Sequence, residues 1–143
     1  MRAYAPGRYE KLAWNGRTLI LDGAHNADSA SALAHTLEAD LGPLAKVVLL
    51  TNMLLGHDPA AFYRPLVDLA TAAVTAPIEF HRRRDPDETA TVLNQLGVRS
   101  EAAASVEEAL LRCAEISGSD VPILVTGSFY LVGEVARAIA TAK

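Results

Sequence analysis

Short β-rich runs alternate with longer windows of helical periodicity along almost the whole chain. Strands that alternate with helices in this way form βαβ units around a mostly parallel sheet, because two parallel strands need a crossover connection between them. The predicted strands span residues 9–14, 18–21, 46–51, 72–75, a short run at Val98, and 122–125. The predicted helices span residues 27–41, 58–69, 85–95, 105–116 and 128–141.

The dipeptide Asn15-Gly16 separates the first two predicted strands and interrupts this alternation. Asn-Gly favours the tight turn of a β-hairpin, since both residues tolerate a positive φ. We therefore expect an α/β fold, a Rossmann-like three-layer sandwich with a mostly parallel sheet and an antiparallel hairpin at its N-terminal edge. The 143 residues fit one domain from residue 1 to 143, because a chain of this length buries about two thirds of its unfolded surface.

Local signals set the expected helix starts. An Asp-Pro pair at 58–59 and another at 85–86 each place an N-cap side chain before a proline at the first helical position. Ser105, with Glu108 three residues later, has the spacing of a capping box, in which each side chain bonds the backbone N–H of the other residue. These signals predict that helices begin at these three places.

Composition argues against two classes of partner. The net charge is −4, whereas a nucleic-acid surface needs clustered basic residues, so we expect no nucleic-acid partner. The basic run 82–84 is followed by acidic residues and is expected to be a solvated loop. Every apolar run falls short of the roughly 18 residues that a membrane span requires, and the first residues carry no hydrophobic signal core.

Cys113 is the one cysteine of the chain and lies in a helical window. We expect a buried, reduced thiol there, with no disulfide and no zinc site. With the absence of a membrane span, this favours a cytoplasmic protein.

Polar residues follow the apolar run 18–21 at once. Asp22 either caps local backbone or binds a polar ligand, and Gly23 permits close approach of the backbone. His25 can donate to a carboxylate or a phosphate oxygen, although a lone histidine is often only structural. Asn26 is a good N-cap for the helix that follows. Because ligands of open α/β sheets bind at the carboxyl ends of strands, this turn is a candidate site.

A second polar turn, Thr126-Gly127-Ser128, lies between the last predicted strand and the last helix. Free N–H groups at a helix start and the helix dipole favour an anion, so a carboxylate or phosphate is the natural ligand. The alternative is that Ser128 only caps the helix. Two such turns suggest one composite site.

Two further residues point toward the same edge of the sheet. Arg8 precedes the first strand, and a guanidinium suits phosphate or carboxylate, although a solvated charge is the simpler interpretation. His57 follows the exit of the strand 46–51, where helix capping by its neighbour Asp58 is the simpler interpretation. The sequence contains no G-x-x-x-x-G-K-[ST] loop and no G-x-G-x-x-G fingerprint, so the usual equipment for a triphosphate or a dinucleotide is missing. It also contains no metal-ligand cluster.

Three motifs together resemble a known family. PGRYE at residues 6–10, LDGAHN at 21–26 and VTGSFYLVGE at 125–134 resemble, in this order, the C-terminal domain of folylpolyglutamate synthase/dihydrofolate synthase in the Mur ligase superfamily. Members join an amino acid, usually glutamate, to a carboxylate on a pterin compound with ATP. The resemblance implies that the ATP-binding central domain is absent from this chain and must be supplied in cis or in trans.

The resemblance also implies roles for individual residues. Arg8 and Asp22 would contact ATP, while His25 and Ser128 would hold the incoming glutamate. A supporting set would comprise Gly23, Asn26, Gly127 and His57. ATP and Mg would serve the full-length enzyme, with none bound firmly by this domain alone, and no catalytic residue or metal ligand would come from this chain. We therefore expect the chain alone to be inactive.

One departure and two alternatives accompany the resemblance. Residues 56–58 read Gly-His-Asp where the family commonly has Asp-Lys-Asp, so a lysine contact is replaced at best by the weaker donor His57. The chain could instead be a stand-alone module that binds an amino acid or a nucleotide without catalysis. It could also belong to a Mur-type ligase of cell-wall precursors.

Overall fold

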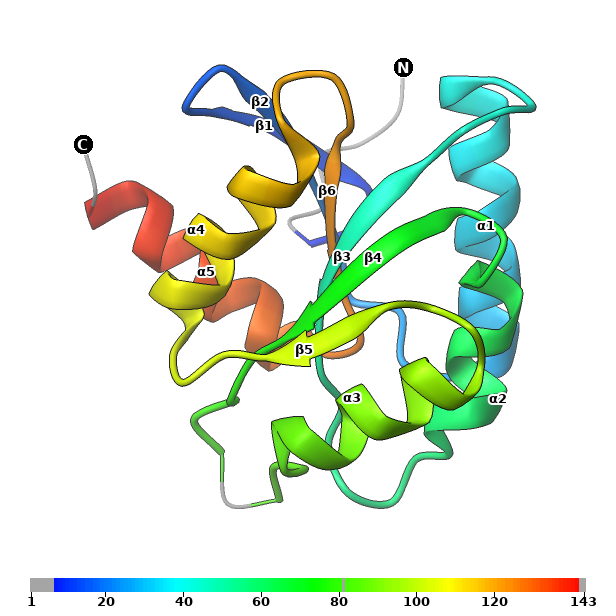
Figure 1. The fold of residues 1–143 in the computed structure, drawn as a ribbon, viewed down its shortest axis with the longest axis vertical. Coiled ribbons are helices and arrows are strands. Elements are labelled where there is room, and N and C mark those ends of the chain that lie inside the picture. Colours follow the sequence, from blue (N-terminus) through cyan, green and yellow to red (C-terminus); the bar gives the residue numbers. More distant parts are fainter. Residues whose placement is uncertain (1–6, 81, 142–143) are drawn as a thin grey trace.

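A computed structural model of the chain describes residues 7–80 and 82–141, so Pro6 of the first motif lies outside the described residues. Six strands form one sheet in the order β1-β2-β6-β3-β4-β5 (Figure 1). The strands are β1 Glu10–Trp14, β2 Arg17–Asp22, β3 Val47–Thr51, β4 Ala70–Thr75, β5 Ser100–Ala102 and β6 Ile123–Thr126. The helices are α1 Ala27–Leu41, α2 Pro59–Tyr63, the 3₁₀ turn η1 Arg64–Leu66, α3 Pro86–Gln95, α4 Val106–Ser117 and α5 Phe129–Thr141.

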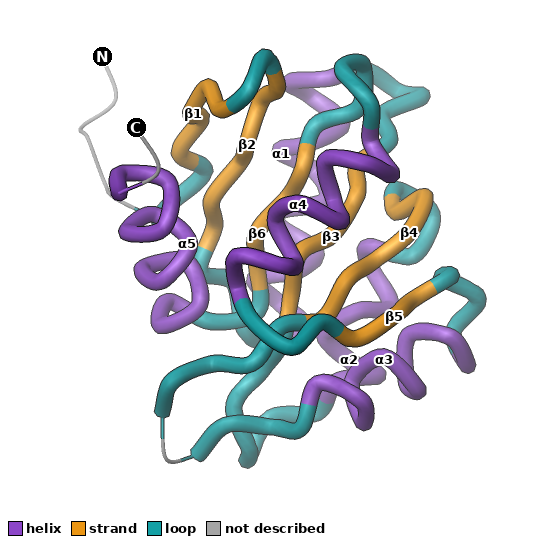
Figure 2. Tube along the Cα trace, turned by 60° about the vertical axis from the view of Figure 1, so that its left-hand side comes forward, coloured by secondary structure: helices purple, strands orange, loops and turns teal. Residues whose placement is uncertain are grey.

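The pairing of the strands confirms the predicted fold class. β1 and β2 are antiparallel through the hairpin at Asn15-Gly16, and all other neighbouring strands are parallel. The last strand, β6, lies between β2 and β3, which Figure 2 shows from the side of α4. The prediction of a mostly parallel sheet with an antiparallel hairpin at its N-terminal edge is therefore confirmed.

Two apolar cores cover the two faces of the sheet. Alternate residues of one strand point to opposite faces, so Ile20 packs with α1, α2 and α3 while Leu19 and Leu21 pack with α4 and α5. Figure 1 shows these two helical layers on opposite sides of the sheet. All three side chains are fully buried, and each such burial stabilises the fold by about 1.5–3 kcal/mol. The sandwich thus has the three layers that the sequence pattern predicts.

The single helix predicted over residues 58–69 is wrong in its length. Asp58 caps the helix as expected, since its carboxylate accepts the N–H of Ala61 at 3.3 Å. The α-helix ends at Tyr63 and continues as the 3₁₀ turn η1, which contains Pro65. Proline has no N–H for the next bond of the helix and its ring crowds the preceding turn, so the helix tightens and stops there.

Two smaller predictions are corrected near α3 and α4. The short strand predicted at Val98 lies instead at Ser100–Ala102, because Val98 is buried beneath the end of α3 and its N–H donates to the carbonyl of Leu93. Ser105 caps α4 through the N–H of Glu108. The reciprocal half of the capping box is displaced by one residue, since a carboxylate oxygen of Glu108 accepts the N–H of Ala104.

Cys113 lies on the buried face of α4, and its thiol faces the carbonyl oxygen of Leu49 at 3.6 Å. Burial raises the pKa of this thiol to about 12, so it stays protonated and unreactive at neutral pH. Among residues 7–80 and 82–141, no helix has the length and apolar character to cross a membrane.

Candidate functional site

The two polar turns meet at one edge of the sheet. β2 and β6 are neighbours in parallel register, with Asp22 beside Thr126 at their carboxyl ends. The N–H of Gly127 donates to the carbonyl of Ala24 at 3.0 Å, which ties the second turn directly to the first. Segments about a hundred residues apart in sequence therefore form one composite surface, as the sequence predicts.

Two glycines make this close approach possible. A Cβ on Gly127 would lie 2.1 Å from the carbonyl oxygen of Asn52, and the residue has a φ of +115°. A Cβ on Gly23 would lie 2.4 Å from the ring of Phe129. Real Cβ atoms do not approach other atoms this closely, so both positions exclude any larger residue unless the neighbour moves. The close approach of the two turns therefore depends on glycine at both positions.

Asp22 is occupied by the local backbone. One carboxylate oxygen accepts the N–H of Tyr9 at 2.9 Å and the other accepts the N–H of Ala24 at 2.9 Å. Burial raises the pKa of this carboxyl above its usual value, against the opposing effect of the two amides and of Arg8. The carboxylate therefore holds the start of β1 and the turn after β2 in place, and it has only its remaining lone pairs for a ligand.

Arg8 lies on the exposed surface beside these turns. Its guanidinium carbon is 5.4 Å from the centre of the Phe129 ring, close enough for a cation–π contact. The aromatic ring thus lies against the guanidinium group of Arg8, which remains at an exposed position.

A small pocket of about 180 Å³ opens between the turn after β6 and the loop after β3. Its lining residues come from three strand exits: His25, Leu54, His57, Gly127, Ser128, Phe129 and Tyr130. Four of the eight predicted site residues line this pocket. Gly23 packs on the Phe129 ring, which is part of the same lining. Larger hollows exist elsewhere on the described surface, but this pocket is lined by both His25 and His57.

Two imidazoles face one another in this pocket. The ring centres of His25 and His57 are 5.3 Å apart, with an angle of 69° between the ring planes. Nδ1 of His25 lies 3.1 Å from the carbonyl oxygen of Gly23. Only an N–H can bond a carbonyl oxygen, so Nδ1 carries a proton and Nε2 is the nitrogen left for a ligand.

Positive surroundings act on His57. Burial, and then the field of His25, Arg82 and Arg84, lowers the pKa of His57 below its usual value. The loop that carries His57 is therefore electropositive, and a carboxylate that enters the pocket would be attracted by charge as well as by hydrogen bonds.

The start of α5 offers fewer free amides than the sequence suggested. The N–H of Gly127 is bonded to Ala24, and the N–H of Tyr130 donates to the hydroxyl oxygen of Ser128 at 3.0 Å. Ser128 thus caps the helix, and only 4% of the residue is exposed. Its hydroxyl hydrogen is still available to a ligand, because the cap uses only a lone pair of the oxygen.

Asn26 caps α1, as predicted. Its side-chain oxygen accepts the N–H of Ser29 at 2.8 Å, and the hydroxyl of Ser29 accepts the N–H of Asn26 in return. The N–H of His25 also donates to this hydroxyl. The capping box therefore fixes the backbone on which His25 sits, which is a supporting role without contact to the pocket.

Sequence reasoning missed a buried polar group at the end of β3. Asn52 is fully buried and donates to the carbonyls of Ala76 and Arg84, while its oxygen accepts from Met53 and Thr89. A signal was present, since a polar Thr51-Asn52 pair ends an otherwise apolar strand at the ligand edge. Asn52 connects the loop after β3 to the segment that leads into α3.

The expectation of a solvated loop at 82–84 is wrong for Arg84. Its side chain is only 16% exposed, and Nη2 donates to the carbonyl of His57 at 2.9 Å. Among the described residues, no group of three or more His, Cys, Asp or Glu side chains is arranged to hold a metal ion.

Comparisons with known proteins place these features in a family. The family model for "Dihydrofolate synthetase, C-terminal domain" matches residues 7–138. A probable bifunctional folylpolyglutamate synthase/dihydropteroate synthase of Haloferax volcanii is 32% identical over 134 residues, which cover 92% of this chain and 15% of that protein.

Solved structures agree with the sequence comparison. E. coli FolC in complex with DHPP and ADP matches with a TM-score of 0.85 and 25% identity, over 96% of this chain and 32% of that chain. The bifunctional folylpolyglutamate synthase/dihydrofolate synthase of Yersinia pestis, complexed with AMPPNP and Mn ion, matches with a TM-score of 0.84 and 28% identity over the same shares. The chain spans about a third of these structures and a smaller part of the curated relative. It belongs to the family of dihydrofolate synthetase C-terminal domains.

Proposed function

We propose that this chain is the glutamate-side domain of an ATP-dependent amide ligase that adds glutamate to the carboxylate of a folate, tetrahydrofolate or dihydropteroate. An ATP-binding central domain, in the same chain or in a partner, completes the active site. The chain alone is then catalytically silent, because it contains only one half of the site.

One observation carries this proposal. The turns after β2 and β6 are joined by the bond from Gly127 to Ala24, and they bring His25 and Ser128 to the same pocket. A carboxylate in this pocket would find an imidazole nitrogen, a hydroxyl donor and a positive field within a small volume. This donor set suits an anionic amino acid.

The surface around Arg8, which we propose faces the nucleotide, carries a positive charge that suits the phosphates of ATP. Arg8 presents an accessible guanidinium near the edge of the sheet, which is the fork that phosphate oxygens prefer. Asp22 orders the backbone at Tyr9, directly after Arg8, and at Ala24 in the turn after β2, and its remaining lone pairs can accept from a sugar hydroxyl. ATP supplies the phosphoryl group that activates the folate carboxylate, with Mg as its counterion.

The proposed contacts to glutamate depend on the orientation of the His25 ring. Nε2 of His25 points away from the Gly23 carbonyl that holds Nδ1, and it can donate to a carboxylate when protonated. The buried hydroxyl of Ser128 adds a second donor, and His57 adds a supporting one. Holding the amine beside the activated carboxylate contributes to catalysis through proximity, without chemistry by this chain.

A chimera tests the proposal. This chain replaces the matching third of E. coli FolC, and glutamate-dependent release of ADP is measured with dihydropteroate or tetrahydrofolate as acceptor. We expect turnover by the chimera and none by the isolated chain. Arg8→Ala should raise the KM for ATP, while Arg99→Ala, an exposed arginine before β5 and thus at the opposite end of a parallel strand, should not.

Two results would contradict the proposal. One is ligation by the isolated chain, since it would show that no second domain is needed. The other is tight binding of glutamate by the isolated chain, measured by calorimetry without nucleotide, together with an inactive chimera. That outcome would favour a stand-alone binding module.

A further inference from the structure

The loop after β3 is built to carry His57 to the pocket. Residues 53–55 run beside residues 82–84, with an antiparallel bridge between Leu54 and Arg83. The N–H of Leu55 donates to the carbonyl of Arg82 at 2.7 Å, and that of Arg84 donates to the carbonyl of Met53 at 3.3 Å. The segment that leads into α3 is therefore the support on which the His57 loop rests.

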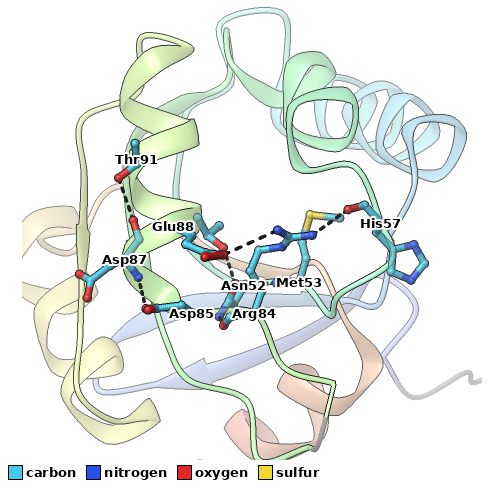
Figure 3. Close-up of polar contacts among 9 residues, drawn as sticks. Asn52, Met53, His57, Arg84, Asp85, Asp87, Glu88 and Thr91 are labelled. Atoms are coloured by element: carbon cyan, nitrogen blue, oxygen red, sulfur yellow. Dashed lines mark hydrogen bonds and ion pairs between the residues drawn. The ribbon is translucent and has the colours of Figure 1, made fainter.

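Arg84 makes hydrogen bonds to both ends of the loop after β3. Its carbonyl accepts from the buried amide of Asn52 at 2.8 Å, and its guanidinium donates to the carbonyl of His57 at 2.9 Å (Figure 3). The hydroxyl of Thr89 holds the other end of the Asn52 amide at 2.6 Å. One residue thus links the buried end of β3 to the backbone of His57.

Stability alone does not explain this arginine. Its nearest carboxylate, Glu88, is 4.0 Å away and 62% exposed. Within the described part of the chain, Nε of Arg84 is buried and has no hydrogen-bond partner. A largely buried cation with so weak a counter-charge costs free energy, and apolar residues often replace such groups without loss of stability. This free-energy cost is offset if Arg84 contributes to ligand binding in the pocket.

We propose that Arg84 is a positioning residue for the glutamate pocket, which holds the loop 52–58 so that the His57 imidazole faces that of His25. The argument rests on the proposed function for the identity of the ligand, but the positioning itself is a property of this chain. Arg84 lines no part of the pocket and acts through the His57 backbone. Its charge also contributes, after burial and the fields of His25 and Arg82, to the lowered pKa of His57.

NMR of the 143-residue chain tests the positioning directly. Arg84→Met keeps the apolar stem but removes the donors and the charge. We expect loss of the cross-peak between the ring protons of His25 and His57, and a rise in the His57 pKa as the nearby cation is removed. Arg99→Met, the exposed control, should change neither. If Arg84→Met does not fold, Arg84→Gln provides the same two readouts.

Kinetics in the FolC chimera tests the consequence. Arg84→Met should raise the KM for glutamate by roughly three- to tenfold, the factor that corresponds to one lost hydrogen bond, while kcat and the KM for ATP stay unchanged. An unchanged cross-peak and His57 pKa in a folded variant would overturn the inference, as would an unchanged glutamate KM in an active chimera. If the parent chimera is inactive, the proposed function fails and the NMR result still decides the positioning.

Discussion

At the scale of single residues, Gly127 and Gly23 show how steric limits create the site. Gly127 allows the backbone after β6 to pass within contact of Asn52, and Gly23 lets the Phe129 ring close over the turn after β2. The sequence predicted both glycines as supporting residues, but it did not reveal which atoms they approach. Those neighbours come from other elements and are fixed only when the sheet is assembled.

Gly127→Ala should destabilise the fold strongly. The added Cβ would clash with the Asn52 carbonyl, and the positive φ disfavours any side chain, so we expect a loss of about 2–4 kcal/mol in the free energy of unfolding. Urea denaturation measures it. Gly118→Ala is the matched control, because Gly118 also has a positive φ of +61° but its Cβ would meet no described atom within 4 Å. Equal losses in the two variants would contradict the steric account.

His57 should give the stability of the chain a characteristic pH dependence. Its pKa is lowered in the folded chain from 6.5, so the unfolded chain binds this proton more tightly. Its contribution to stability is therefore present above the unfolded pKa and lost as the pH falls through the folded pKa.

We therefore predict that the stability of the chain falls less with decreasing pH when His57 is replaced. Between about pH 7 and about pH 5, the free energy of unfolding of His57→Gln should decrease less steeply than that of the parent chain. His35→Gln, at an exposed position of α1, should retain the parent slope. A steeper fall in His57→Gln would reverse the sign and refute the assigned direction of the shift.

At the scale of elements, the sequence predicted the strands, the hairpin and most helix starts because these depend on local signals. Asp58, Asp85 and Ser105 cap their helices as expected. The errors arise where a tertiary contact or a proline competes with the periodic pattern. Pro65 ends α2 early, and Val98 is drawn into the core so that β5 starts later.

The polar network at the end of β3 could not be read from local patterns. Thr51 donates to the carbonyl of Thr126 at 2.6 Å and contacts the hydroxyl of Tyr63 at 2.8 Å, while Asn52 bonds the segment before α3. These partners are up to 75 residues away in sequence. The network joins β3 to β6, α2 and α3.

Asn52→Ala tests how much this hydrogen-bond network stabilises the fold. The substitution leaves two carbonyls, one N–H and one hydroxyl without partners, and we expect a loss of about 3 kcal/mol in the free energy of unfolding. Asn94→Ala is the control, because the Asn94 side chain makes two hydrogen bonds, both to Ser100, at an exposed position. That variant should lose about 1 kcal/mol or less. A similar loss in both would show that burial of Asn52 adds nothing.

At the scale of the whole molecule, the position of β6 brings the candidate site together. Because β6 lies between β2 and β3, the exits of three strands converge and place His25, His57 and Ser128 around one pocket. Each turn was visible in the sequence, but the strand order that joins them was not, since it depends on how the crossovers pack. The two polar turns at strand exits were enough to suggest a composite site, but not which strands lie side by side.

The same convergence supports the proposal that a second domain completes the site. The pocket holds only about 180 Å³ and lies at the edge of the sheet with Phe129 and Tyr130 half exposed beside it. Arg8 presents its charge on the same side, over the Phe129 ring. We interpret this surface as one wall of an active site that another domain closes.

The KM for glutamate in the FolC chimera tests this account most directly. His25→Ala should raise that KM by about tenfold or more, since it removes a hydrogen bond to a charged group, while the KM for ATP stays constant. His35→Ala, on the exposed face of α1, should leave both values unchanged. A His25→Ala chimera with an unchanged KM for glutamate would contradict the claim that the exits of β2 and β6 form the glutamate pocket.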